Sequence, residues 1–203
     1  ATSGNTGIAL AMIAQLFQIE IELVLPEDST KERTQTMRAY GATVILTPAN
    51  EGIIGSRNYA DKKVEEGGYL MLNQFANEDN WKAHYKTTGP EIWNDTQGTI
   101  THFVSAMGTT GTIIGTSTYL KEKNPAIQII GAQPSDGSQI PGIRKWPQEY
   151  LPKIFDPSKV DTVVDVSEEE ARAMTKRLAL EEGVFAGMSS GGSVAVALKI
   201  AEQ

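Results

Sequence analysis

Three loops rich in glycine, serine and threonine each precede a helical stretch in this chain of 203 residues. They are Thr2–Gly7, Gly108–Thr112 and Gly187–Gly192. A helix N-terminus offers unpaired backbone N–H groups and about half a positive charge. Glycine lets an anion approach the backbone, and hydroxyl side chains add donors. The loops are therefore candidate anion-binding sites; the alternative is that they are only helix caps and tight turns.

The spacing within these loops does not match the common nucleotide-binding motifs. Residues 108–115 read G-T-T-G-T-I-I-G, which differs from the dinucleotide pattern G-x-G-x-x-G, and the chain has no G-K-[ST] sequence. The hydroxyl-rich loops fit a phosphate plus a carboxylate better than a pyrophosphate.

Short β-rich runs alternate with helical stretches, which predicts an α/β fold of βαβ units, with mostly parallel sheets and helices on both faces. Strands are predicted at 21–25, 43–47, 69–72, 100–106, 127–132 and 160–166. Helices are predicted at 4–16, 29–40, 51–66, 79–95 with a break at Gly89-Pro90, 112–123, 167–183, and after Gly191-Gly192. In such sheets the loops gather at the carboxyl ends of the strands, where ligands bind.

Two helix starts carry a capping-box spacing, Ser29 with Glu32 and Ser167 with Glu170. The polar stretch 73–80 predicts a boundary between a small N-terminal domain, residues 1–78, and a larger C-terminal domain, residues 79–203. The first contains the loop Thr2–Gly7 and the second the loop Gly108–Thr112. Both ends are predicted helices with no flanking strand, so we interpret the chain as the middle part of a longer polypeptide.

Composition excludes several classes of function. The net charge of −7 argues against nonspecific nucleic-acid binding and against docking on anionic membranes. The absence of cysteine excludes thiol catalysis and Cys-ligated zinc, and only two histidines make a His-rich metal site improbable, so we expect no metal. A cysteine-free α/β chain suits the cytoplasm.

Several segments together resemble one enzyme family, the O-acetylserine sulfhydrylases or cysteine synthases, which are fold type II pyridoxal 5'-phosphate (PLP) enzymes of the tryptophan-synthase-β class. The segments are Ala1–Gly7, His84–Trp93, Gly108–Thr112 and Gly187–Gly192. The resemblance covers essentially the whole chain. The pair Thr109-Thr110 and the segment Ile140–Pro147 look like the B form of the family.

The resemblance implies a PLP site and a role for each matching residue. The PLP phosphate would be held by Gly108, Thr109, Thr110, Gly111 and Thr112. Asn5 would hydrogen-bond the ring oxygen, and Ser189 would face the pyridine nitrogen. The α-carboxylate of the substrate would be bound by Thr2, Ser3, Thr6 and Gln74. A neutral Ser189 would make the ring a weaker electron sink than a carboxylate would, which suits β-elimination more than transamination.

Two further expectations concern charged side chains. The family forms its Schiff base through a lysine upstream of the Ser3-Gly4-Asn5 loop, and no lysine here matches that motif. The catalytic residue is therefore unknown within this chain, which we expect to be inactive alone. Arg144 lies in the proline-rich irregular segment 134–159 and is a candidate substrate contact, against the alternative of a surface charge or ion pair.

The resemblance implies a transferase of cysteine biosynthesis, a cytoplasmic homodimer that makes L-cysteine by β-replacement. Its small-molecule substrates would be O-acetyl-L-serine or O-phosphoserine and a sulfur donor, sulfide or thiosulfate. Alternatives are another fold type II PLP lyase, such as a cystathionine β-synthase or a serine/threonine dehydratase, and a non-catalytic fragment that binds PLP or an anion.

Overall fold

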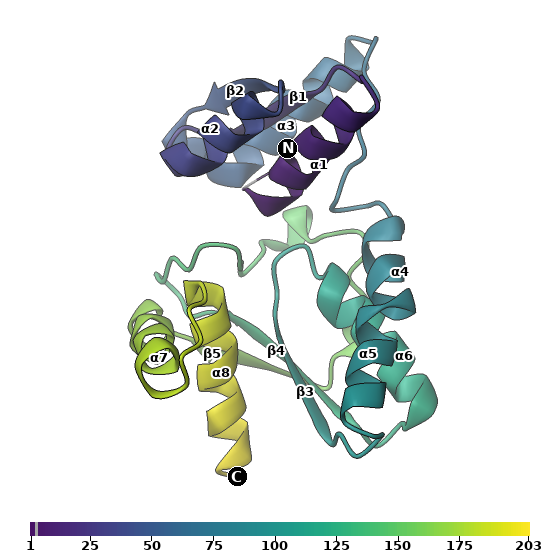
Figure 1. Cartoon of the computed structure of the whole chain (residues 1–203), viewed down its shortest axis with the longest axis vertical. Helices are drawn as coiled ribbons and strands as arrows, with labels where there is room; N and C mark the ends of the chain where they lie inside the picture. The colour runs from purple at the N-terminus through teal and green to yellow at the C-terminus, as the bar shows by residue number, and fades with distance from the viewer. Residues whose placement is uncertain (3) are drawn as a thin grey trace. The chain divides into compact units, whose positions relative to one another are not determined.

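The computed structural model describes residues 1–2 and 4–203 and divides into two compact units, Ala1–Asn73 and Gln74–Gln203 (Figure 1). The division falls inside the polar stretch 73–80. Each unit contains a parallel sheet with helices packed against it, and each is described separately below.

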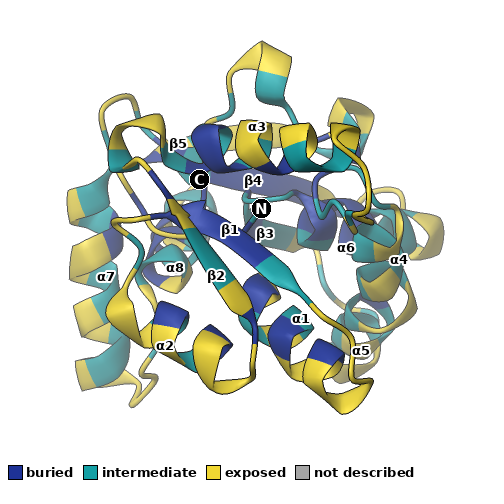
Figure 2. Ribbon diagram, turned by 90° about the horizontal axis from the view of Figure 1, so that it is seen from above, coloured by how far each residue is buried: buried dark blue, intermediate teal, exposed yellow. Residues whose placement is uncertain are grey.

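Unit 1 is a two-stranded parallel sheet with three α-helices. Its elements are α1 (Asn5–Leu16), β1 (Glu22–Pro26), α2 (Lys31–Ala39), β2 (Thr43–Thr47), the 3-10 turn η1 (Ala49–Glu51) and α3 (Gly52–Glu65). Strand β1 pairs with β2 in parallel, with Leu23 opposite Val44. A small core of Ala11, Leu23, Leu25, Met37 and Ala42 joins α1 and α2 to the sheet. Figure 2 shows β1 as a mostly buried strand flanked by exposed helix surfaces.

Unit 2 is a three-stranded parallel sheet in the order β3-β4-β5. Its elements are α4 (Asp79–Lys86), α5 (Thr88–Asp95), β3 (His102–Ala106), α6 (Gly111–Lys123), β4 (Gln128–Pro134), η2 (Gln148–Tyr150), η3 (Pro157–Lys159), β5 (Thr162–Val166), α7 (Glu168–Glu181) and α8 (Met188–Ala201). Figure 1 shows the helices α4, α5 and α6 grouped on one side of this sheet and α7 and α8 on the other.

Alternating side chains of the central strand β4 serve two separate cores. Ile130 and Ala132 pack with residues of α7 and α8. Ile129 lies on the other face, in a cluster with Ile113 and Leu120 of α6. This period of two residues is the strand geometry that buries both faces of a parallel sheet. The expected α/β fold, with parallel sheets and helices on both faces, is confirmed.

Several predicted elements need correction. Residues 69–72 form no strand; Leu70 in this segment is exposed and pairs with no strand of the described chain. Helix α2 begins at Lys31 after Thr30 and has no side-chain cap, so the predicted Ser29 capping box does not form. The break in 79–95 falls at Thr87, and Pro90 lies within the first turn of α5, where proline is tolerated.

The start of the last helix also differs from the prediction. Helix α8 begins at Met188, so Gly191 and Gly192 lie inside it. A Cβ at Gly191 would collide with the carbonyl oxygen of Ala171 in α7, which makes this glycine a packing requirement. By contrast, the Ser167 capping box is confirmed: its Oγ accepts from Glu170 N, and Glu170 Oε2 accepts from Ser167 N.

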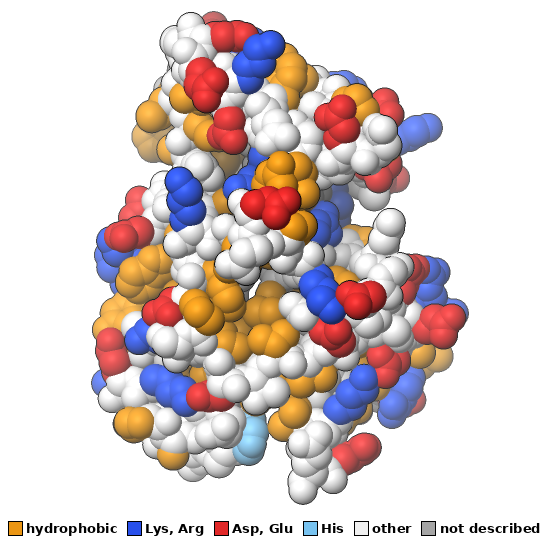
Figure 3. Space-filling view, turned by 180° about the vertical axis from the view of Figure 1, so that it is seen from behind, with side chains coloured by type: hydrophobic (Ala, Val, Ile, Leu, Met, Phe, Trp, Pro, Cys, Tyr) orange, Lys and Arg blue, Asp and Glu red, His pale blue; other side chains and the backbone are white. Residues whose placement is uncertain are grey.

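Acidic and basic side chains are interspersed over the face in Figure 3, without a continuous patch of one sign. Among residues 1–2 and 4–203, no helix is both long enough and apolar enough to cross a bilayer.

Candidate functional site

The loop Gly108–Thr112 follows the carboxyl end of the parallel strand β3, and its last two residues, Gly111 and Thr112, begin α6. Thr110 has a left-handed backbone (φ 70°), which is uncommon for a β-branched residue. Its side chain is buried, and its Oγ1 has no hydrogen-bond partner anywhere in the described chain. Leaving a buried hydroxyl unpaired costs about 1–3 kcal/mol. The other such atom, Thr116 Oγ1, lies within α6 rather than at its start.

The hydroxyl of Thr109 is held by two donors. Asn80 Nδ2 lies 3.1 Å from Thr109 Oγ1, and the backbone N–H of Gly111 donates to the same oxygen at 3.4 Å. A Cβ at Gly111 would collide with Asn80 Oδ1. Packing against Asn80, and not only the approach of an anion, therefore requires glycine at position 111.

Hydrogen bonds hold the segment Ile140–Pro147 beside this loop. The indole Nε1 of Trp146 donates to the carbonyl of Gly108 at 2.7 Å, and the backbone N–H of Arg144 donates to the carbonyl of Met107 at 2.9 Å. Ile140 and Ile143 are buried in the core of unit 2. The sequence indicated no role for Trp146. Its only available signal was an aromatic residue between two prolines in an otherwise irregular segment.

Ser189 and Arg144 are placed within the same unit as the loop. Ser189 is half-buried in the first turn of α8, and a Cβ at Gly142 would lie 3.8 Å from its Oγ. Gly142 has a φ of 93°, a conformation that favours glycine. Arg144 is half-buried, and its Nη1 donates to the carbonyl of Ile143 at 2.8 Å. Gly142 thus lies close to Ser189 on one side, and its carbonyl lies close to Gly108 on the other.

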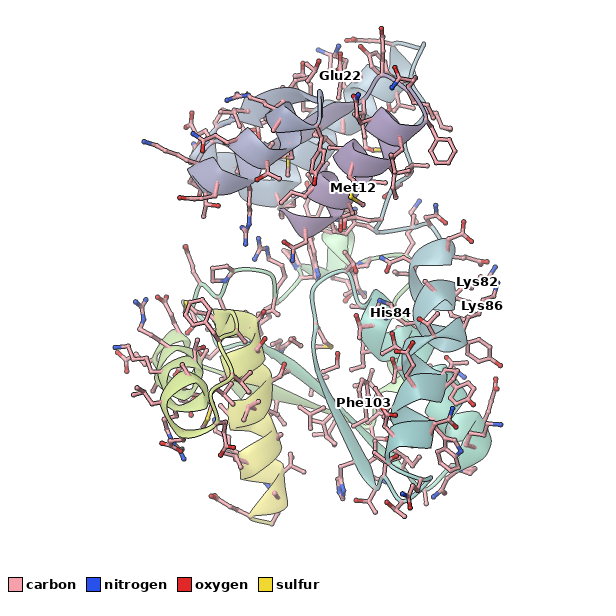
Figure 4. All side chains as sticks on the ribbon, in the orientation of Figure 1. Met12, Glu22, Lys82, His84, Lys86 and Phe103 are labelled. Atoms are coloured by element: carbon pink, nitrogen blue, oxygen red, sulfur yellow. The ribbon has the colours of Figure 1, made fainter. Side chains whose placement is uncertain are left out.

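Helix α4 contributes a second contact to the loop. His84 Nε2 lies 3.3 Å from Thr112 Oγ1, and His84 Nδ1 lies 2.9 Å from Thr88 Oγ1. Burial lowers the pKa of His84, which favours the neutral imidazole. Lys86 is exposed in the last turn of the same helix, and Figure 4 labels it on a different side of α4 from His84.

In unit 1, Thr2 organises the start of α1. Its Oγ1 accepts from the backbone N–H groups of Gly4 and Gly7, both at 3.1 Å, and the residue is buried. A Cβ at Gly7 would lie 2.6 Å from Thr2 Cγ2 and 2.7 Å from Met37 Cε, so this glycine permits close packing. Asn5 and Thr6 are exposed in the first turn of α1. Ser3 lies outside the described residues.

Gln74 belongs to unit 2 and begins the chain that leads into α4. Its carbonyl accepts from Asn80 Nδ2 at 2.7 Å. Close contacts therefore join three of the predicted parts of unit 2: the loop Gly108–Thr112, the segment Ile140–Pro147 and Ser189. Asn80 in addition links this loop to Gln74. Sequence reasoning missed Asn80 entirely.

Comparison with known proteins defines the family. The profile of the family described as pyridoxal-phosphate dependent enzyme matches residues 1–203. The chain belongs to this family. Its members take PLP as cofactor, and the fold found here is theirs.

Individual relatives are cysteine synthases. The chain is 59% identical over 203 residues to cysteine synthase B of Pseudomonas aeruginosa, covering all of this chain and 68% of that protein. It is 52% identical to cysteine synthase B of Escherichia coli, covering 67% of that protein. The crystal structure of cysteine synthase from Entamoeba histolytica superimposes with a TM-score of 0.90 at 36% identity, over 100% of this chain and 62% of that one. The chain thus spans about two thirds of the length of the relatives it matches.

The residues of unit 2 fit the phosphate of PLP. A phosphate oxygen is a strong acceptor, and Thr110 Oγ1 is a buried hydroxyl that lacks one. The loop also lies at the N-terminus of α6, a helix of 13 residues, where the helix dipole favours an anion.

Proposed function

We propose that the complete protein is a cysteine synthase that replaces the β-substituent of an O-activated L-serine with a sulfur nucleophile. The substrates would be O-acetyl-L-serine or O-phosphoserine and sulfide or thiosulfate. When bound, PLP withdraws electrons from the substrate's α-carbon, which makes loss of the β-substituent accessible. The observation that carries the proposal is the unpaired, buried Thr110 hydroxyl at the start of α6, in a chain whose relatives are cysteine synthases.

The residues of this chain would bind PLP and the substrate and hold them in a fixed orientation. In this proposal the phosphate is held by Gly108, Thr109, Thr110, Gly111 and Thr112. Ser189 shares one neutral hydrogen bond with the pyridine nitrogen, and Asn5 hydrogen-bonds the ring oxygen. The α-carboxylate of the substrate is held by Thr2, Ser3, Thr6 and Gln74. The oxygen of Thr2 already accepts two backbone N–H groups, so Thr2 would bind the carboxylate by donating its hydroxyl proton.

The direct test is a reconstitution of the complete protein with PLP. Mixing it with O-acetyl-L-serine and sulfide should release acetate and form L-cysteine in equal amounts. Borohydride reduction before substrate addition should trap a PLP-lysine adduct, whose position mass spectrometry would give. Cystathionine from serine and homocysteine, or ammonia and an oxo acid from serine alone, would instead support the alternative PLP lyases. PLP binding without turnover of any of these substrates would support a non-catalytic binding protein.

Arg144 gives a sharper prediction about the substrate. A guanidinium pairs with a phosphate or thiosulfate through two parallel charge-assisted hydrogen bonds. We expect Arg144→Ala to lower kcat/KM by about 10- to 100-fold with O-phosphoserine or thiosulfate, because such a contact contributes about 1.5–3 kcal/mol. The rate with O-acetyl-L-serine and sulfide should change much less. Equal losses with all four reactants would leave Arg144 without a role in charge recognition.

We also propose that the protein acts in the cytoplasm as a homodimer. The absence of cysteine from the sequence and the bacterial cysteine synthases among its relatives support the compartment. The homodimer is what the resemblance to the cysteine synthases implies. Sedimentation of the complete protein at micromolar concentration would give its oligomeric state, and fractionation of cells that express it would give its compartment.

A further inference from the structure

We infer that Asn80 is a positioning residue for the phosphate loop: it fixes the Thr109 hydroxyl so that its proton points at a bound anion. This inference rests on the proposed phosphate-binding function of the loop. Asn80 lies in the first turn of α4, outside the loop itself, and no direct contact with the phosphate is needed for its action.

The orientation of the Asn80 amide follows from its neighbours. The carbonyl of Gln74 can only accept a hydrogen bond, and it lies 2.7 Å from the amide nitrogen. The donor end of the amide therefore faces Gln74. The same nitrogen lies 3.1 Å from Thr109 Oγ1, so it donates its second proton there. The carbonyl end, Oδ1, lies in the space that a Cβ at Gly111 would need.

The direction of the Thr109 proton follows in turn. A hydroxyl oxygen has two lone pairs and one proton. Thr109 Oγ1 accepts from Asn80 Nδ2 and from the backbone N–H of Gly111, which also can only donate. Both lone pairs are thus used, and the proton donates to no other group in the part of the chain that the structure describes. It is left for an acceptor outside the protein, which is what a phosphate oxygen provides.

The packing of α4 on α6 keeps this arrangement rigid. A Cβ at Gly115 would collide with the carbonyl of Trp81 and lie 2.8 Å from His84 Cβ. Gly111 and Gly115 are one turn apart on α6, so the two glycines allow the backbones of α4 and α6 to lie close. The side chain of Asn80 is therefore held at the loop by its helix, and little conformational entropy remains to be lost when an anion binds.

The test compares PLP with pyridoxal, which lacks the phosphate, on the cofactor-free complete protein. Asn80→Ala should weaken PLP binding by between about two- and tenfold, the effect of one neutral hydrogen bond, and leave pyridoxal binding unchanged. Asn94→Ala, an exposed asparagine in α5, is the matched control and should change neither. Equal weakening of both ligands by Asn80→Ala would mean a general structural role and would overturn the inference.

A double-mutant cycle tests whether Asn80 acts through Thr109. Thr109→Val removes the hydroxyl and should itself weaken PLP binding; in that background Asn80→Ala should have no further effect. Additive losses would overturn the inference and leave the proposed phosphate loop intact. An unchanged ratio of PLP to pyridoxal affinity in Thr109→Val would instead remove Thr109 from the phosphate site and end both claims.

Asn80→Asp provides a second variant of nearly the same shape, in case the alanine protein is unstable. The carboxylate cannot donate to Thr109 Oγ1; it accepts the hydroxyl's own proton and adds a negative charge beside the anion. We expect a larger loss of PLP affinity than for alanine, with the melting temperature of each variant recorded beside it. Wild-type PLP affinity in Asn80→Asp would contradict the inference.

Discussion

The glycine-rich loops of the two units have similar compositions but differ in the hydrogen bonds of their buried threonines. In unit 1, the oxygen of Thr2 accepts two backbone N–H groups at the start of α1, and the side chains of Asn5 and Thr6 are exposed. In unit 2, the buried hydroxyl of Thr110 has no partner within the described residues, and the acceptor sites of Thr109 are filled. Thr2 and Thr109 thus both accept two N–H groups, and the hydroxyl that sets the second loop apart is that of Thr110.

This difference shows what loop composition cannot reveal. Threonine beside glycine at a helix start is compatible with a helix cap and with an anion site. An unpaired buried hydroxyl adds what composition lacks, because it is costly and a bound acceptor removes that cost. Thr110 lies at the N-terminus of α6, where an anion is favoured, whereas Thr116 lies within the helix. Variants that alter one loop and not the other test this difference.

The largest effect is expected at Gly111. Gly111→Ala adds a Cβ that collides with Asn80 Oδ1, so we expect a loss of about 1–3 kcal/mol in unfolding free energy and weaker PLP binding. The control is Gly192→Ala: a Cβ there would meet Val166 Cγ1 at an ordinary 3.5 Å, and alanine in a helix is more favourable than glycine by about 0.5–1 kcal/mol. Denaturant unfolding should therefore show a lower unfolding free energy for Gly111→Ala and a higher one for Gly192→Ala. Losses of equal size in the two variants would contradict the packing argument.

A smaller effect is expected at Thr2. Thr2→Val keeps the shape of the side chain but removes the acceptor for the N–H groups of Gly4 and Gly7, which should cost about 0.5–2 kcal/mol, as for loss of a helix cap. Thr6→Val, at an exposed position of the same helix, should change unfolding free energy by less than about 0.5 kcal/mol. Indistinguishable melting curves for the two variants would show that Thr2 does not organise α1.

The smallest effect is the pH dependence that His84 adds to stability. Burial places its pKa in the folded protein below the value of about 6.5 expected in the unfolded chain. The unfolded chain therefore binds the extra proton first, so the contribution of His84 is complete above about pH 6.5 and is lost as pH falls through the folded pKa. His84→Gln should flatten the fall in unfolding free energy between pH 7.5 and 5.5. If unfolding free energy falls equally with pH in the wild type and in His84→Gln, other groups cause the fall.

Elements set by local sequence were predictable. The run Thr43–Thr47 is a strand with the predicted bounds, and the Ser167 capping box forms both of its hydrogen bonds. Tyr69–Leu72 has the same β-rich composition but is not a strand in the structure, because a strand also depends on a neighbouring strand that composition does not specify. The interior position of Gly191 in α8 depends on the crossing of α7, which is a tertiary contact.

The sequence suggests the residue types of the candidate site but not the contacts that hold its loop in place. The loop Gly108–Thr112 follows from its glycines and hydroxyls. The contribution of Asn80 requires the packing of α4 against α6, and that of Trp146 requires the return of an irregular segment to Gly108. Neither contact has a fixed spacing along the chain, so no periodicity indicates it.

Thr110→Val in the cofactor-free complete protein is the most direct test of anion binding by this loop, because it removes the unpaired hydroxyl without changing the shape of the side chain. We expect two opposite changes. Unfolding free energy without cofactor rises by about 1 kcal/mol, since an unsatisfied buried group is gone, and PLP affinity falls about 10- to 100-fold, while pyridoxal affinity is unchanged. Loss of stability without cofactor together with unaltered PLP affinity would show instead that the Thr110 hydroxyl stabilises the folded chain and binds no anion.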